Sequence, residues 1–171
     1  ASSGYGLIRE TLADRRDEGK SIDEIHRWIE EHKLNREHWF FSTDLQYYVR
    51  GGRISKASGF FGTLLRICPL LNRDEDGKLR PREKIRTIKK VEEAIVEKRK
   101  GDAANGKDYT GKVFISQSNC INRANPVKDA VEAYFTKRNG KVVVNWIGTT
   151  IGSHTGPGTV ALFYWGKKRT S

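Results

Sequence analysis

One short segment near the carboxyl end combines side chains that could bind an anion. Residues 151–158 read Ile-Gly-Ser-His-Thr-Gly-Pro-Gly, so three glycines and a proline constrain a turn that presents Ser153, His154 and Thr155. An imidazole, two hydroxyls and backbone N–H groups can all donate hydrogen bonds to an oxyanion. The alternative is a rigid connection between two strands that carries a solvated histidine. The residues alone leave both interpretations open.

Basic side chains form two further candidate sites. Five cations occupy every second position of one segment: Lys78, Arg80, Arg82, Lys84 and Arg86. In a strand this spacing places all five on one face, and Pro81 on the opposite face favours an edge strand or a bulge. The cations then either protect that edge from aggregation or form a docking strip for an anionic partner. Separately, the sequence Gly-Gly-Arg-Ile-Ser at 51–55 presents Arg53 directly after a predicted helix.

The charge of the chain also points to an anionic partner. The 171 residues carry a net charge of +11, and residues 78–100 alone hold ten Lys or Arg and four Asp or Glu. A concentration of positive charge favours an anionic binding partner, which could be nucleic acid, phosphate, a membrane surface or an acidic protein. One hypothesis is therefore a nucleic-acid-binding module in which aromatic side chains stack on bases. The candidate stacking residues are Tyr47, Tyr48, Phe60 and Phe61.

Several classes of protein are not expected. No run of about 18 apolar residues and no signal-peptide pattern is present, which favours a cytoplasmic protein without a membrane span. Cys68 and Cys120 lack the spacing of a zinc site, and His26, His32 and His38 are expected to be surface positions, so no metal is predicted. The usual catalytic motifs are missing, and a hydrolase built on Ser153 and His154 would lack an acid to orient the imidazole. We therefore predict a protein that is not an enzyme.

The first 35 residues form a unit of their own in the sequence. Leu7, Ile8 and Leu12 recur at helical spacing, and Ser21 with Glu24 has the spacing of a capping box before a second helix. No strand precedes this helix pair, which suggests part of a domain. We place a boundary near residue 36, with one unit at 1–35 and a second at 36–171.

The second unit alternates predicted strands and helices. Helices are expected at 45–50, 60–65, 88–101 and from Pro126 up to Asn139-Gly140, the last starting at Asn125-Pro126. Strands are expected at 39–41, from Ile67 onward, at 78–87, 112–116, 141–147 and 159–165, with an Asp-Gly turn at 76–77 and a glycine-rich turn around His154. The predicted fold class is α+β, an antiparallel or mixed sheet covered by helices.

These segments together resemble the DegV family. The resemblance rests on Phe-Phe-Ser-Thr-Asp-Leu-Gln-Tyr-Tyr at 40–48, Gly-Gly-Arg-Ile-Ser at 51–55, Leu-Leu-Arg-Ile-Cys-Pro at 64–69, Lys-Ile-Arg-Thr at 84–87 and Ile-Gly-Ser-His-Thr-Gly-Pro-Gly at 151–158. It extends in order over essentially the whole chain. It implies a two-domain fold that holds a long-chain fatty acid between its domains, as a carrier with no other cofactor, and it favours that ligand over nucleic acid.

The resemblance also implies roles for individual residues. His154, with Ser153 and Thr155, would bind the fatty-acid head group, whereas Arg53 and Arg86 would meet a fatty-acid kinase or the acyl phosphate that it makes. The acyl tunnel would be walled by Phe60, Phe61, Leu64, Leu65 and Ile67. Residues 1–35 resemble only the closing helices of the amino-terminal DegV domain, whose hydroxyl-bearing loops are not found here. We therefore expect this chain to bind fatty acid weakly by itself.

Overall fold

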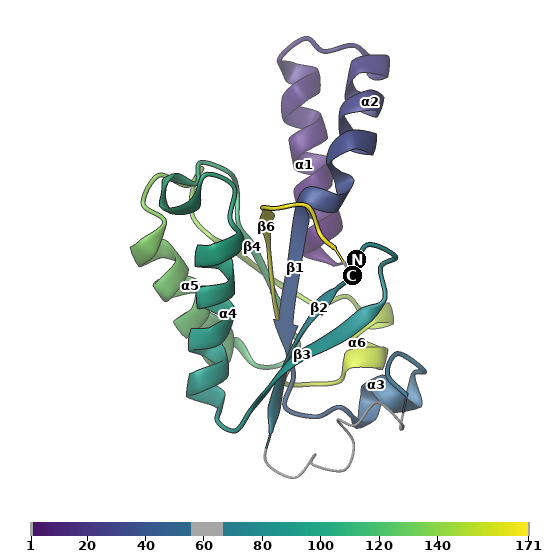
Figure 1. The fold of residues 1–171 in the computed structure, drawn as a ribbon, viewed down its shortest axis with the longest axis vertical. Coiled ribbons are helices and arrows are strands. Elements are labelled where there is room, and N and C mark those ends of the chain that lie inside the picture. Colours follow the sequence, from purple (N-terminus) through teal and green to yellow (C-terminus); the bar gives the residue numbers. More distant parts are fainter. Residues whose placement is uncertain (1, 56–66, 171) are drawn as a thin grey trace.

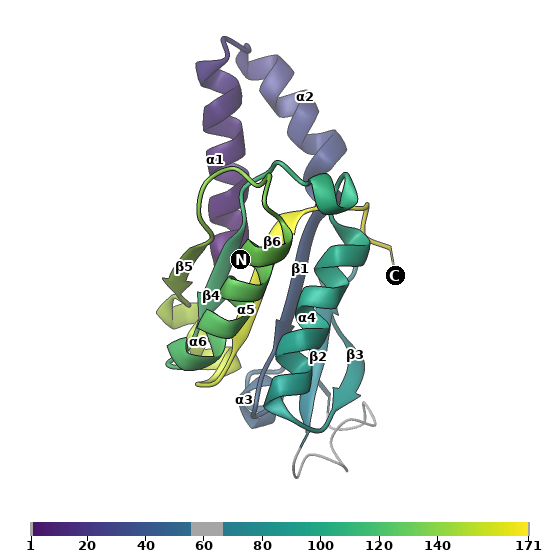
Figure 2. The same ribbon diagram turned by 90° about the vertical axis from the view of Figure 1, so that its left-hand side faces the viewer.

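The computed structural model describes residues 2–55 and 67–170 (Figures 1 and 2). Their strands form one six-stranded sheet in the order β3-β2-β1-β6-β4-β5. The strand bounds are β1 Arg36–Phe41, β2 Cys68–Arg73, β3 Leu79–Ile85, β4 Phe114–Gln117, β5 Val143–Trp146 and β6 Val160–Trp165. Neighbours pair antiparallel except for β4 and β5, which are parallel. The predicted α+β fold with a mixed sheet is confirmed.

Strand β3 behaves as its alternating charges predict. It lies at one edge of the sheet, and its burial alternates so that Arg80, Arg82 and Lys84 are exposed. Pro81 pairs with Leu71 next to a shift in register, where a missing N–H is tolerated. The Asp-Gly turn at 76–77 joins β2 to β3, and Gly77 has a φ of 79° that favours glycine. The prediction of a basic edge strand in a hairpin is therefore confirmed.

Two helices cover one face of the sheet, α4 (Ile88–Asp102) and α5 (Ile121–Tyr134), as Figure 1 shows. Trp39, Phe41 and Leu162 point from the sheet into this core. The predicted start of α5 at Asn125-Pro126 is wrong, because Pro126 lies inside the helix. The helix starts earlier since Gln117 Oε1 accepts a hydrogen bond of 2.7 Å from the Cys120 N–H, directly before Ile121.

The helices of the described ranges cover the opposite face at its two ends. The first turns of α1 (Ser3–Asp17) pack at one end, and the short helices α3 (Gln46–Arg50) and α6 (Thr149–Thr155) contact each other at the other end. Leu7, Phe40, Tyr48 and Phe163 belong to the smaller core on this face. Between the two ends no helix of the described residues covers the sheet, and the candidate site lies there.

Helix α2 (Ile22–His32) starts with the predicted capping box. The Ser21 hydroxyl accepts a hydrogen bond from the Glu24 N–H, and Glu24 Oε2 accepts one of 2.8 Å from the Ser21 N–H. Figures 1 and 2 show α1 and α2 as a pair that extends beyond the sheet. A 3₁₀ turn, η1 (Lys33–Asn35), leads from α2 into β1, and a second, η3 (Gly106–Asp108), follows α4.

The segment around His154 differs from its prediction. Residues 149–155 form helix α6 and not the expected open turn. Gly148 stands at the helix N-cap with extended backbone, and Gly156 ends the helix with a φ of 69°. The glycines therefore delimit a single helical segment, which fixes the position of His154 in its last turn.

Candidate functional site

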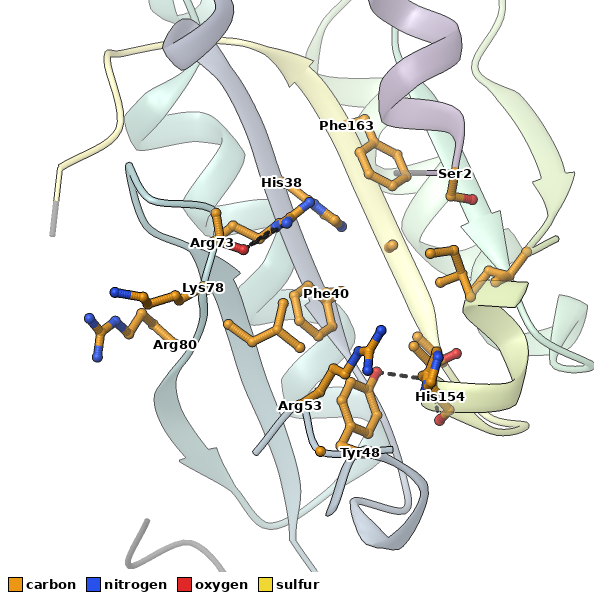
Figure 3. A pocket seen from close by; sticks show the side chains of 18 residues that line it. Ser2, His38, Phe40, Tyr48, Arg53, Arg73, Lys78, Arg80, His154 and Phe163 are labelled. Carbon is orange, nitrogen blue, oxygen red and sulfur yellow. Dashed lines mark hydrogen bonds between the residues drawn. The ribbon is translucent and has the colours of Figure 1, made fainter. Parts of the chain in front are cut away.

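A cavity of about 580 Å³ lies on the partly uncovered face of the sheet. Strands β1 and β6 form its floor, the start of β3 lines one side, and α6 with the loop after α3 closes the end shown at the bottom of Figure 3. Among its lining side chains are Ser2, His38, Phe40, Tyr48, Arg53, Arg73, Leu79, Ile147, Ile151, His154, Thr155, Thr159, Ala161 and Phe163. The cavity thus combines an apolar floor with polar groups at both ends.

The two glycine motifs of the sequence meet at this cavity. A Cβ on Gly51 would collide with Nδ1 of His154, so the imidazole lies directly against the Gly51 backbone. A Cβ on Gly156 would meet the Tyr47 ring, and one on Gly158 would meet Thr43 Oγ1. Glycine is needed where chains approach this closely. Segments 43–51 and 151–158, a hundred residues apart, therefore form one packed unit.

The predicted head-group residues do not all face the cavity. His154 and Thr155 are half-buried and line it, and the Thr155 hydroxyl is buried without a partner among the described residues. Ser153 is exposed, and its hydroxyl donates to the Thr150 carbonyl at 2.9 Å. The geometry brings the imidazole and one of the two predicted hydroxyls to the cavity.

A buried hydroxyl network supports this end of the cavity. Tyr48 is fully buried, and its hydroxyl lies 3.3 Å from Thr159 Oγ1, which is 3.1 Å from Ser42 Oγ. Burial raises the pKa of the Tyr48 phenol well above its usual value, so the group stays protonated and can donate a hydrogen bond. Tyr48 therefore cannot stack on a base, and that part of the nucleic-acid hypothesis is wrong.

The structure separates the two predicted arginines. Arg53 is exposed at the cavity wall, and its NH1 donates to the Gly51 carbonyl at 2.7 Å. Arg86 is also exposed, but it lies beyond the end of β3 and does not line the cavity. Arg53 lines the cavity and lies near His154 and Tyr48 in Figure 3.

Most of the predicted acyl wall cannot be compared with the cavity, because it lies outside the residues that the structure describes. Phe60, Phe61, Leu64 and Leu65 fall outside the described residues, and Ile67 is half-buried but does not line the cavity. Within the described residues, the apolar surface of the cavity comes from Phe40, Ala161, Phe163, Ile147, Ile151 and Leu79. The period-two pattern of β6 could have identified Ala161 and Phe163, because alternate residues of a strand face the same side.

His38 contradicts its prediction as a surface residue. It is only 8% exposed, it lines the cavity, and its Nδ1 has no hydrogen-bond partner among the described residues. Its ring centroid lies 4.5 Å from that of Phe163 and 5.3 Å from that of Phe40. Burial, then the charges of Arg36 and Arg73, holds the pKa of His38 well below its usual value, so the imidazole is neutral.

Much of the positive charge of the edge strand is paired. Lys78 Nζ lies 3.0 Å from Asp76, Arg80 Nε lies 2.7 Å from Asp74, and Arg82 Nε donates to Asn72 Oδ1 at 2.8 Å. The two ion pairs, of Lys78 and Arg80, reduce the charge that the strip offers to a partner. In the described ranges, no cluster of three His, Cys, Asp or Glu side chains could hold a metal ion. None of the helices described is long and apolar enough to cross a membrane.

Comparison with known proteins identifies the family. The family model described as "Uncharacterised protein, DegV family" matches residues 1–167. The DegV domain-containing protein CPE0026 of Clostridium perfringens is 34% identical over 166 residues, covering 97% of this chain and 56% of that protein. This chain belongs to the DegV family, and it spans just over half the length of such relatives.

Two solved structures share the fold. The fatty acid binding DegV family protein SAG1342 of Streptococcus agalactiae superposes with a TM-score of 0.79 at 27% identity, over 95% of this chain and 56% of that one. The Fatty Acid Kinase (Fak) B3 protein of Streptococcus pneumoniae, loaded with linoleic acid, gives a TM-score of 0.80 at 20% identity, over 94% and 55%. At that lower identity the likeness shows the fold alone.

Proposed function

We propose that this chain forms one side of a binding site for a long-chain fatty acid and acts as a carrier in the cytoplasm, not as an enzyme. One observation carries the proposal: a single cavity joins His154, Thr155 and Arg53 to a floor of Phe40, Ala161 and Phe163. The head group would lie at His154 and the hydrocarbon chain would follow the floor. Ser153, one residue before the imidazole, would contribute only its backbone, since its hydroxyl bonds within α6.

The energetics of such a ligand fit this arrangement. Each methylene that leaves water is worth about 0.8 kcal/mol, so the apolar floor supplies most of the affinity. A buried carboxylate without donors is too costly, so it needs hydrogen bonds at the closed end. His154, the Thr155 hydroxyl and the backbone can supply them. The likeness to SAG1342, a fatty acid binding DegV family protein, supports the same ligand class.

We further infer that a second domain completes the cavity. In this arrangement residues 1–35 are the closing helices of an amino-terminal DegV domain and residues 36–171 are the carboxyl-terminal domain. Three features support it: the relatives are almost twice as long, α1 and α2 extend beyond the sheet, and Trp146, beside the cavity residue Ile147, is 68% exposed. For experiments, the "completed protein" is this chain joined to the part of the C. perfringens relative outside the match.

Replacing His154 by alanine in the completed protein is expected to weaken fatty-acid binding about tenfold to a hundredfold, because one hydrogen bond to a charged group is worth about 1.5–3 kcal/mol. The melting temperature should stay within about 2 °C, since Gly156, Gly158 and Pro157 hold the segment. Isothermal titration with palmitate measures the affinity. His26→Ala, an exposed histidine on α2, is the matched control. Equal affinity of both variants would show that His154 is only a structural neighbour of Gly51.

A kinase would have to reach the carboxylate through the open side of the cavity. We propose that Arg53, at the cavity wall, and Arg86, beyond β3, meet a fatty-acid kinase or the acyl phosphate that it makes. Both side chains are exposed. A guanidinium can hold a phosphate through two parallel hydrogen bonds, whereas lysine acts as a point charge.

The arginine proposal predicts a separation between binding and phosphorylation. Arg53→Ala and Arg86→Ala are expected to keep palmitate affinity within about threefold but to lower acyl-phosphate formation by a kinase catalytic subunit about tenfold or more, with partial rescue by lysine. Lipid occupancy and acyl phosphate are measured on the same preparations at fixed salt. Arg16→Ala, an exposed site on α1, is the control. Loss of lipid with normal phosphorylation per bound lipid would place these arginines in the binding site instead.

A further inference from the structure

The end of the cavity opposite His154 is not lined by hydrocarbon alone. Figure 3 shows His38, Phe163 and Ser2 at this end, Arg73 beside His38, and Phe40 between them and the His154 end. A site for a simple acyl chain needs only apolar contacts where the chain ends. Here Nδ1 of His38 has no hydrogen-bond partner among the described residues, and the His38 side chain is only 8% exposed.

Positive charge gathers behind this end. Arg36, two residues before His38 on the same face of β1, is 6% exposed, and its Nε and NH1 have no partner within the described part of the chain. Its guanidinium lies against the backbone of Gly4 in the first turn of α1. Burial, and then the charges of Arg169 and Arg73, lowers the pKa of Arg36 to about 10, so it is still charged at neutral pH.

The carboxylates near this cluster, Glu37 and Asp74, offset its charge only in part. Asp74 is buried and pairs with Arg80 at 2.7 Å, and it also accepts from the Lys78 N–H. Burial raises the pKa of Glu37 to about 7, and its side chain is on the other face of β1 from Arg36. Arg73 donates through Nε and NH2 to the Gly77 carbonyl, which leaves NH1 out of that contact. The end of the cavity is therefore rich in donors and poor in acceptors.

We propose that this end binds an oxyanion at the far end of the ligand, so that the lipid class is an acyl chain with a second carboxylate. His38 and Arg73 contact that group, and Arg36 stabilises it from behind. Buried donors without acceptors are rare in folded proteins, and a charged acceptor forms the strongest hydrogen bonds with them. This inference rests on the proposed function, because the first carboxylate occupies the His154 end.

The length of the floor fits a chain with two polar ends. Thr159, next to the Tyr48 hydroxyl, and Phe163, next to His38, are separated by four residue steps along β6, which is about 13 Å at ~3.3 Å per residue. Ala161 and the paired Phe40 lie midway and provide the apolar stretch. The two polar ends are thus far enough apart to hold the two ends of one extended chain.

The test compares diacids with monoacids in the completed protein. Decanedioic, dodecanedioic and hexadecanedioic acids are titrated calorimetrically, each against the monocarboxylic acid of the same length. At least one diacid is expected to bind about tenfold or more tightly than the monocarboxylic acid of the same length. His38→Leu and Arg73→Met should each remove that preference, so that a diacid and the monoacid of the same length bind with equal affinity. Arg82→Met, an exposed arginine of β3 that does not line the cavity, should keep it.

The outcomes separate this inference from the proposed function. Tight monoacid binding with no diacid preference, or a preference that survives both variants, would overturn the inference and leave the proposed function standing. Failure of every acid to bind would overturn both. If a variant does not fold, the imidazole NMR signals of His38 in the unmodified completed protein decide, because they should shift with the preferred diacid and not with its monoacid.

Discussion

Replacing Ala161 by tryptophan in the completed protein is expected to lower fatty-acid affinity about a hundredfold or more, equivalent to about 2.7 kcal/mol. Ala161 lies at the middle of the cavity floor, is 5% exposed, and pairs across the sheet with Phe40. An indole at this position would fill the space that the hydrocarbon chain occupies. Since the volume beside it is open, the ring can enter the cavity and need not displace the core.

Two controls accompany this variant. Ala161→Ser adds one oxygen and should reduce affinity less than about tenfold, and the tryptophan variant should melt at a temperature near that of the unmodified protein. Affinity is measured by titration with palmitate, and folding by circular dichroism. If the folded tryptophan variant bound palmitate normally, the acyl chain would not lie on this floor.

Replacing Arg99 by alanine is expected to reduce the free energy of unfolding by about 2–5 kcal/mol, as for truncation of a large buried side chain. Arg99 is fully buried on α4, and the rings of Tyr109, Phe135 and Tyr164 lie 4.2, 3.8 and 4.8 Å from its Cζ. No hydrogen-bond partner of its guanidinium is found among the described residues. The side chain therefore stabilises the core through packing and cation–π contacts.

A matched pair of variants separates these two contributions. Arg99→Met restores buried hydrocarbon without the charge and should recover about half of the loss caused by alanine. Urea unfolding at constant m-value gives the free energies, and Arg16→Ala on the exposed face of α1 should change stability by less than about 0.5 kcal/mol. A loss below about 1 kcal/mol for Arg99→Ala would mean that the aromatic cage closes without the guanidinium.

Short sequence patterns correctly predicted the features that depend only on residues close together in the chain. The capping box at Ser21 and Glu24, the Asp-Gly turn before β3 and the alternating cations of that strand all appear as expected. Each depends on contacts within a few residues, which the sequence states directly. The mixed sheet also followed, because strand-forming runs alternate with helical ones.

The predictions failed where distant segments decide the structure. The strand predicted at 39–41 starts at Arg36, and His38, predicted at the surface, is buried in it because β2 and β6 pair on both sides of β1. Pro126 looked like a helix start, but Gln117 fixes that start at Ile121. The contact of Gly51 with His154 could not be read from either motif alone. These features depend on contacts between segments that are far apart in the chain, and no short sequence pattern indicates such contacts.

The most direct test of the proposed function is to measure the lipid bound to two purified proteins, this chain alone and the completed protein. Native mass spectrometry gives the stoichiometry, and analysis of the solvent extract gives the acid. We expect about one long-chain acid per completed protein and little on this chain alone, because half of the cavity wall is then open to water. Tight one-to-one binding by this chain alone would contradict the proposal that a second domain completes the site. The absence of lipid on a folded completed protein would contradict the proposed fatty-acid binding.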